Sequence, residues 1–302
     1  MKRFIFKIFL FIMPLILLYI FVEYKLRNIE SIYELKRNGL IAQSDSIEIL
    51  IVGNSHACDG INPLYFKQSA YNLAFGSQTI LYDKQLILKY IGILKNLKYV
   101  IISLDYPSLY WGFSKDRDFF YYHYYGINIR NKSYFKENFS YFFYVYSPKT
   151  SVEILMNNNK LKLVDGWTGY DSTNYSLLTE KLGKKRVESF NADIKNSRQT
   201  KEHEYICSEL ELLIDFLKQK EIIPILITVP CYKYYTVNLD SNILESNLQY
   251  INKLKEKYNL VYLNSLNDTS FNASDFYNND HLNKYGAEKY SKKLESMINQ
   301  NK

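Results

Sequence analysis

The chain has 302 residues, of which 47% are hydrophobic and 23% charged, and its formal net charge is +7. This length is enough for one large α/β domain or two small ones, and the composition excludes a disordered chain. The basic residues are scattered without a basic run or an RNA-binding signature, so we expect no nucleic-acid partner. The three cysteines form no C-x-x-C pair. That argues against a zinc site, and we expect neither a metal nor a cofactor.

The N-terminus carries the longest apolar segment. Residues 4–22 form a nineteen-residue stretch whose single charge is Lys7, and about 20 apolar residues span a bilayer. Residues 24–27 read YKLR rather than a small-x-small cleavage site, which favours an uncleaved anchor over a signal peptide. We therefore predict a single-pass membrane anchor over residues 1–24. Basic residues lie on both sides of it, so the positive-inside rule leaves its orientation open.

Beyond the anchor we predict a polar, helical stalk over residues 25–45 and an α/β domain over residues 46–302. Short apolar or β-branched runs predict five strands, at residues 47–52, 71–75, 99–104, 222–229 and 260–263. Apolar residues at helical spacing predict amphipathic helices around residues 80–94, 210–217 and 287–298. Strands that alternate with helices predict a parallel sheet covered on both faces.

Several residues that can do chemistry follow the predicted strands. Ser55, Gly76, Asp105 and Pro230 each fall just past the end of one. Ligands of parallel α/β sheets bind outside the carboxyl ends of the strands. We therefore expect these four residues to converge although they are far apart in the sequence.

A stretch of about residues 106–200 separates the third and fourth predicted strands, and it is too long for a simple crossover. We predict an insertion there. Eighteen of the forty-one residues from Tyr106 to Tyr146 are aromatic, and Trp167 follows. Aromatic side chains dominate packing wherever they are buried, so we expect most of these rings to form a small separate core. One or two exposed rings near the site remain candidates for stacking on a sugar.

Two segments supply the groups that serine chemistry needs. Ser55 directly follows the first predicted strand, and Gly53 permits an unusual backbone conformation in the turn that exposes the hydroxyl. His281 lies in a loop before the last predicted helix, from which its ring can face the end of the first strand. Ser55 lies outside a G-x-S-x-G elbow, which argues against the α/β-hydrolase fold.

These segments resemble motifs of the SGNH/GDSL hydrolase superfamily. Residues 53–56 (GNSH) are similar to its first block, and Gly76 is similar to the glycine of its second block. Residues 280–283 (DHLN), followed by Gly286-Ala287, are similar to its last block. The resemblance covers roughly residues 46–302 apart from the insertion. It implies an SGNH (flavodoxin-like) three-layer α/β/α fold, here preceded by one transmembrane helix.

The resemblance also implies a role for each matching residue. Ser55 would be the nucleophile, and His281 would act as general base and then as general acid. The backbone N–H groups of Ser55 and Gly76 would form the oxyanion hole. Asn54, His56 and Asn278 are candidate pocket residues, although a hydrogen bond from His56 to the backbone is an equal alternative.

Two positions depart from the family pattern. The family usually has an aspartate three residues before the histidine, where this chain has Asn278. We choose Asp280 as the acid that orients His281, with Asp275 or a backbone carbonyl as alternatives. The third-block asparagine, an oxyanion donor in the family, has no clear match. Asp105 lies near that position, and we expect it to cap a turn.

The anchored part of this superfamily often modifies cell-surface carbohydrate. The resemblance therefore implies a serine esterase or O-acyltransferase that O-acetylates a cell-surface polysaccharide through an acyl-serine intermediate. Its catalytic domain would be extracytoplasmic, beyond the reach of acetyl-CoA, so a membrane-bound O-acyltransferase partner would supply the acyl group. Two alternatives remain open: a carbohydrate or lipid esterase, and a catalytically weak glycan-binding accessory protein.

Overall fold

The computed structural model describes residues 2–113, 115–156 and 163–300. The described chain divides into two compact units, and one boundary between them falls inside helix α2 (Ile32–Ala42). Unit 1 takes its residues from 1–35 and 116–162, and unit 2 from 36–115 and 163–302. The domain boundaries drawn from the sequence stay a prediction.

Unit 2 is built on a five-stranded parallel sheet in the order β2-β1-β3-β4-β5. The strands are β1 (Ile49–Val52), β2 (Ala70–Asn72), β3 (Tyr99–Ser103), β4 (Ile223–Thr228) and β5 (Val261–Asn264). The four residues of β1 are all buried, which explains why this strand reads as an unbroken apolar run. The strand order is that of flavodoxin-like sheets, so the predicted fold class is confirmed.

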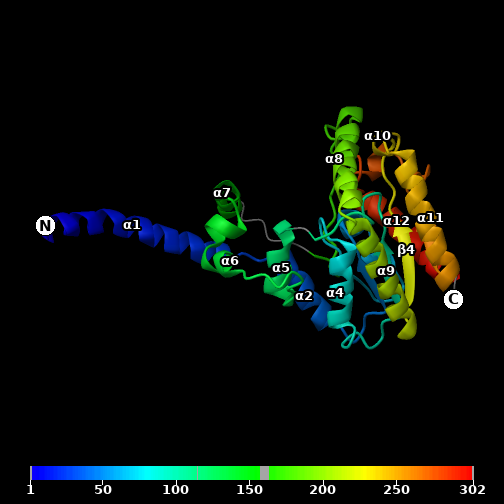
Figure 1. Ribbon diagram of the computed structural model, residues 1–302, viewed down its shortest axis with the longest axis horizontal. Coiled ribbons are helices and arrows are strands. Elements are labelled where there is room, and N and C mark those ends of the chain that lie inside the picture. Colours follow the sequence, from blue (N-terminus) through cyan, green and yellow to red (C-terminus); the bar gives the residue numbers. More distant parts are fainter. Residues whose placement is uncertain (1, 114, 157–162, 301–302) are drawn as a thin grey trace. The chain divides into compact units, whose positions relative to one another are not determined.

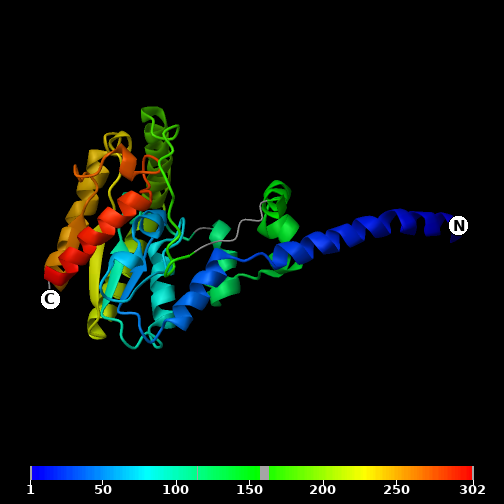
Figure 2. The ribbon, with the colours of Figure 1, turned by 180° about the vertical axis from the view of Figure 1, so that it is seen from behind.

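Helices cover both faces of this sheet. Side chains of α3 (Ser55–Gly60) and α12 (Lys284–Gln300) share one apolar cluster with Ile49 and Ile51 of β1. On the opposite face, α9 (Glu202–Gln219) contacts β4 and packs beside α4 (Ile80–Tyr90) (Figures 1 and 2). The remaining helices of unit 2 are η1 (Pro63–Tyr65), α8 (Glu180–Gln199), α10 (Lys233–Thr236), α11 (Ser241–Tyr258) and η3 (Ala273–Asp275).

Strand β2 ends earlier than the sequence predicts. The apolar run suggested a strand over residues 71–75, but the ladder stops at Asn72. The Asn72 amide donates to the carbonyl oxygens of Ala57 (2.9 Å) and Ile61 (2.8 Å), and its oxygen accepts the Ala74 N–H (3.0 Å). These bonds link the chain to α3, while the N–H groups of Leu73 and Phe75 still donate to the carbonyls of Ile51 (2.8 Å) and Gly53 (3.2 Å). The chain therefore stays beside β1 as it leads into the loop that carries Gly76.

Unit 1 holds most of the aromatic-rich sequence. Its helices are α1 (Lys2–Arg27), the first residues of α2, α5 (Lys115–Tyr125), α6 (Phe135–Phe139), η2 (Tyr141–Val145) and α7 (Pro148–Met156). Phe119, Tyr134 and Tyr141 are buried together with Leu26 of α1. These rings therefore pack as the small separate core that the sequence predicts.

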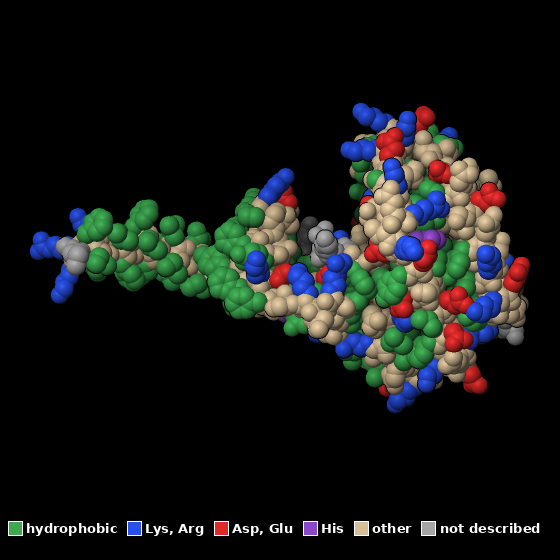
Figure 3. Space-filling view, in the orientation of Figure 1, with side chains coloured by type: hydrophobic (Ala, Val, Ile, Leu, Met, Phe, Trp, Pro, Cys, Tyr) green, Lys and Arg blue, Asp and Glu red, His purple; other side chains and the backbone are tan. Residues whose placement is uncertain are grey.

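Helix α1 exposes its apolar side chains. An 18-residue window of the N-terminal helical region has a mean hydropathy of 2.7, and none of that window is buried. Figure 3 shows the helix as a nearly continuous hydrophobic surface with basic side chains near its N-terminal end. The helix is long and apolar enough to cross a membrane, and a signal sequence passes the same test. The uncleaved anchor and its orientation stay predictions.

The start of α12 is packed too tightly for a side chain at Gly286. A Cβ there would lie 2.1 Å from the Asp275 carbonyl oxygen, which is backbone and cannot step aside. We predict that Gly286→Ala lowers the free energy of unfolding by about 1–3 kcal/mol, as overpacking does. Gly92→Ala is the matched control, because a Cβ at Gly92 meets no atom within 4 Å. Equal urea midpoints for the two variants would contradict this packing.

Candidate active site

Ser55 is the first residue of α3 and follows β1 after a two-residue turn. Gly53 in that turn has φ 134°, a conformation that residues with a side chain rarely adopt, and a Cβ there would lie 2.7 Å from the Ser103 Cβ. Asn54 caps α3, since its side-chain oxygen accepts the His56 N–H at 2.9 Å. The turn therefore holds Ser55 half-buried at the carboxyl end of the sheet, among buried neighbours.

His281 lies in the loop between η3 and α12. The loop is fixed on both sides of the ring, because the Tyr277 N–H donates to the His281 carbonyl at 2.8 Å and Asn283 accepts the N–H groups at the start of α12. The ring nitrogen Nε2 lies 2.8 Å from the Ser55 hydroxyl oxygen. Residues 226 positions apart in the sequence thus share a hydrogen bond at the sheet edge.

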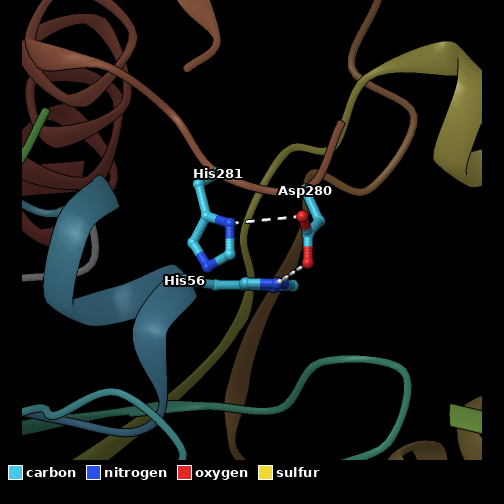
Figure 4. A group of neighbouring side chains, drawn as sticks. All are labelled: His56, Asp280 and His281. Atoms are coloured by element: carbon cyan, nitrogen blue, oxygen red, sulfur yellow. Dashed lines mark ion pairs between the residues drawn. The ribbon is translucent and has the colours of Figure 1, made fainter. Parts of the chain in front are cut away.

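Two oxygens lie beside the other ring nitrogen of His281. The Asn278 side-chain oxygen is 3.1 Å from Nδ1, and an Asp280 carboxylate oxygen is 3.2 Å away (Figure 4). The same Asn278 oxygen accepts the backbone N–H groups of Asp280 (3.0 Å) and His281 (2.8 Å). Those donors require an acceptor, so the amide oxygen faces the ring. Nδ1 therefore carries the proton, and Nε2 is free to accept one from Ser55.

The Asp280 carboxylate is buried among basic side chains from three parts of the chain. Besides His281, it accepts a hydrogen bond from Arg186 of α8 at 2.7 Å and lies 3.5 Å from His56 Nε2. Burial would raise the pKa of Asp280, but the charges and hydrogen bonds of His281 and His56 hold the pKa well below its usual value. Asp280 is therefore ionised beside the ring of His281.

His56 is buried between two carboxylates. Its Nδ1 lies 3.1 Å from an Asp105 oxygen, an ion pair by distance rather than a well-aligned hydrogen bond. Burial would lower the pKa of His56, but Asp105 and Asp280 outweigh it and raise the pKa to about 10. Burial would likewise raise the pKa of Asp105, but the His56 charge lowers it. Ser103 also donates to Asp105 at 2.8 Å.

Gly76 lies in the loop after β2, and a backbone hydrogen bond joins this loop to the turn that precedes Ser55. The Phe75 N–H donates to the Gly53 carbonyl at 3.2 Å, and a Cβ added at Gly76 would meet no atom within 4 Å. The Gly76 backbone therefore borders open space beside the Ser55 turn. The fully buried Lys36 supports the loop by donating to the Ala74 carbonyl, a contact that no motif or spacing in the sequence indicates.

The structure places Asp275 away from His281 and brings Arg186, which the sequence did not suggest, to the site. Asp275 accepts the Asn272 N–H at 2.9 Å and pairs with Lys289 at 3.3 Å, so it belongs to the cap of η3 and not to His281. Arg186 lies in the predicted insertion, and no motif marked it. Its role depends on a contact across 94 positions of sequence.

His56, Asp280 and His281 are close enough to be considered as metal ligands. One ligand atom from each falls within 4.8 Å of the others. A histidine must be neutral to bind a metal, whereas the neighbouring carboxylates keep His56 protonated. Nε2 of His281 is engaged with Ser55, and Asp280 with Arg186. The cluster is therefore better suited to holding protons than to holding a metal ion.

No protein-family model and no curated protein matches this chain. Among solved structures, it is similar to a proposed acylhydrolase from Bacteroides fragilis, with 11% identity and a TM-score of 0.44 over 90% of this chain and 99% of the other. It is also similar to a lipase/acylhydrolase from Enterococcus faecalis, with 10% identity and a TM-score of 0.41 over 84% and 97%. Similarities this low do not indicate the reaction, which has to follow from the geometry of the site.

Asp83 of α4, which accepts a hydrogen bond from the Gly53 backbone, makes the stability of the fold depend on pH. Burial raises the pKa of Asp83 to about 7, against hydrogen bonds from Gln78 and the Gly53 backbone. The folded state therefore keeps a proton that the unfolded state loses, and stability falls as pH rises from about 4 to about 7. We predict that Asp83→Asn matches the wild type at pH 4 and exceeds it at pH 8 by up to about 4 kcal/mol.

Urea unfolding of the two proteins in detergent at both pH values checks this prediction. Asp45→Asn is the control, because Asp45 is an exposed carboxylate in the same unit. A constant difference between Asp83→Asn and the wild type across this pH range would contradict the assignment.

Proposed function

We propose that the chain is a serine-dependent acyl-transfer enzyme of the SGNH type, acting on oxygen esters. The observation that carries the proposal is the 2.8 Å contact of Ser55 Oγ with His281 Nε2, on a ring whose other nitrogen faces Asn278 and Asp280. A nucleophile, a base within hydrogen-bond reach and a group that orients the base are the parts of a serine triad.

The reaction proceeds in two halves. Ser55 attacks the ester carbonyl as its proton moves to His281, and the alcohol leaves with that proton, giving an acyl-serine. A second hydroxyl compound then attacks the acyl carbon, again losing its proton to His281, and Ser55 Oγ leaves as the serine is reprotonated. The N–H groups of Ser55 and Gly76 would stabilise the oxyanion formed in each half.

In this proposal, Asn278 and Asp280 together take the role of the aspartate that the family usually has at the position of Asn278. The Asn278 oxygen is neutral and is anchored by two backbone N–H groups, so it fixes the tautomer and the orientation of the ring. Asp280 is ionised and buried, so it stabilises the positive charge that His281 acquires in each half-reaction. The departure at residue 278 is thus compatible with catalysis.

The proposal also names the compound that accepts the acyl group. We propose that it is a hydroxyl of a cell-surface carbohydrate and that the acyl group is acetyl, delivered through a membrane-bound O-acyltransferase partner. The exposed apolar helix α1 supports the membrane part of this proposal, because it is long and apolar enough to hold the enzyme at a bilayer. With water as acceptor, the same residues would make the protein a carbohydrate or lipid esterase.

The nucleophile and the base are tested by their removal. We predict that Ser55→Ala and His281→Ala each lower kcat for p-nitrophenyl acetate by at least about 10³-fold, because neither group works without the other. Ser69→Ala is the control, since Ser69 lies before β2, away from the catalytic pair. Acetylated sugar among the products, with oligosaccharide present, would identify a transferase. Unchanged turnover in folded Ser55→Ala protein would rule the proposal out.

The buried charge is tested by an isosteric change. We predict that Asp280→Asn lowers kcat by roughly 10²- to 10⁴-fold with a much smaller change in KM, because the charge acts on the transition state. Asn278→Ala should also slow turnover, by loss of ring orientation. Near-normal kcat in Asp280→Asn would mean that Asn278 alone supports His281.

A further inference from the structure

A cavity lies beside the loop that carries Gly76. Its volume is about 360 Å³, within the range of small-molecule sites, and it belongs entirely to unit 2. Ser77 and Thr79 line one side, and Trp111 lines another. Neither Ser55 nor His281 lines it, so the cavity is distinct from the catalytic pair.

Aromatic and acidic side chains complete the lining. The Trp111 ring is held by a hydrogen bond from its Nε1 to Asp193 (3.3 Å) and by an edge contact with Phe190 (5.1 Å). Glu202 lies against Gly112, where a Cβ would come within 1.7 Å of a carboxylate oxygen. Gly112 thus makes room for the carboxylate beside the cavity.

The charge of the lining narrows the class of ligand. Asp193, Glu202 and Asn196 offer oxygen acceptors, and no lysine or arginine appears among the lining residues that the structure describes. Such a surface repels anions and accepts hydrogen bonds from hydroxyl groups. A flat indole beside several acceptors matches a sugar ring, which has an apolar face and hydroxyl groups around its edge.

Helix α8 connects this cavity to the catalytic carboxylate. Arg186 donates to Asp280 and also lies over the Phe190 ring, with its guanidinium carbon 4.5 Å from the ring centre. Phe190 in turn contacts Trp111. The same helix therefore positions one wall of the cavity and one partner of the buried charge.

We propose that this cavity binds a neutral, polyhydroxylated sugar residue of the acceptor, through the Trp111 ring and the carboxylates of Asp193 and Glu202. Its role as an acceptor subsite rests on the function proposed above, whereas sugar binding itself does not. The acidic lining excludes a uronic acid at this position.

Binding to the full-length chain in detergent tests the proposal by calorimetry, with maltotriose and triacetylchitotriose as neutral probes and trigalacturonate as the acidic one. We expect a neutral trisaccharide to bind and the acidic one not to bind. Trp111→Ala and the near-isosteric Asp193→Asn should each weaken binding by about tenfold or more. Glu188→Gln, an exposed carboxylate on the same helix as Asp193, is the control and should leave the Kd unchanged.

Three results would overturn the proposal: no binding of either neutral probe, equal affinity in Trp111→Ala, or tighter binding of tetramethylammonium, which would indicate a cation site. Thermal melting of each variant separates loss of the site from loss of the fold. Because binding is measured without turnover, the same calorimetric titration can also be made with the Ser55→Ala variant. Binding without ester turnover would remove only the acceptor role, and turnover without binding would remove only this inference.

Discussion

The buried carboxylate of Asp280 is the constraint on which the rest of the site depends. Taking an ion out of water costs several kcal/mol unless partners compensate, and Asp280 has three: His281 in its own loop, His56 on α3 and Arg186 on α8. These partners come from widely separated parts of unit 2, so the charge is tolerated only when all of them are in place. The position of His281 against Ser55 follows, because His281 adjoins the residue that they hold.

The second carboxylate, Asp105, is neutralised in the same way. An ionised aspartate near the proposed oxyanion donors would oppose a negative charge there, but His56 lies between Asp105 and Asp280 and stays protonated. Two carboxylates, one imidazolium and one guanidinium leave this layer without net charge. The family asparagine has no counterpart here, so the backbone N–H groups of Ser55 and Gly76 remain as the proposed donors.

The sequence predicted the parallel fold and placed four of the five strands to within two residues. The unbroken apolar runs of β1 and β3 reflect burial on both faces, whereas β5 at the sheet edge is only partly buried. It misjudged the end of β2, because the regular strand stops at Asn72 although backbone bonds to the β1 segment continue through Phe75. The proximity of Ser55 and His281 followed from their motifs. The links from His56 to Asp105 and from Arg186 to Asp280 could not be predicted, because they are contacts between residues without a shared motif or a characteristic spacing.

The central claim is that Ser55 forms a covalent acyl intermediate with the help of His281, and trapping that intermediate tests it most directly. The full-length protein would be mixed briefly with p-nitrophenyl acetate, quenched in acid and mapped by peptide mass spectrometry. If Ser55 is acylated with the help of His281, the peptide that contains Ser55 will carry one acetyl group, and this group will be absent when His281 is replaced by alanine. An unmodified Ser55 peptide, or acetyl groups spread over surface lysines and equal in both proteins, would contradict it.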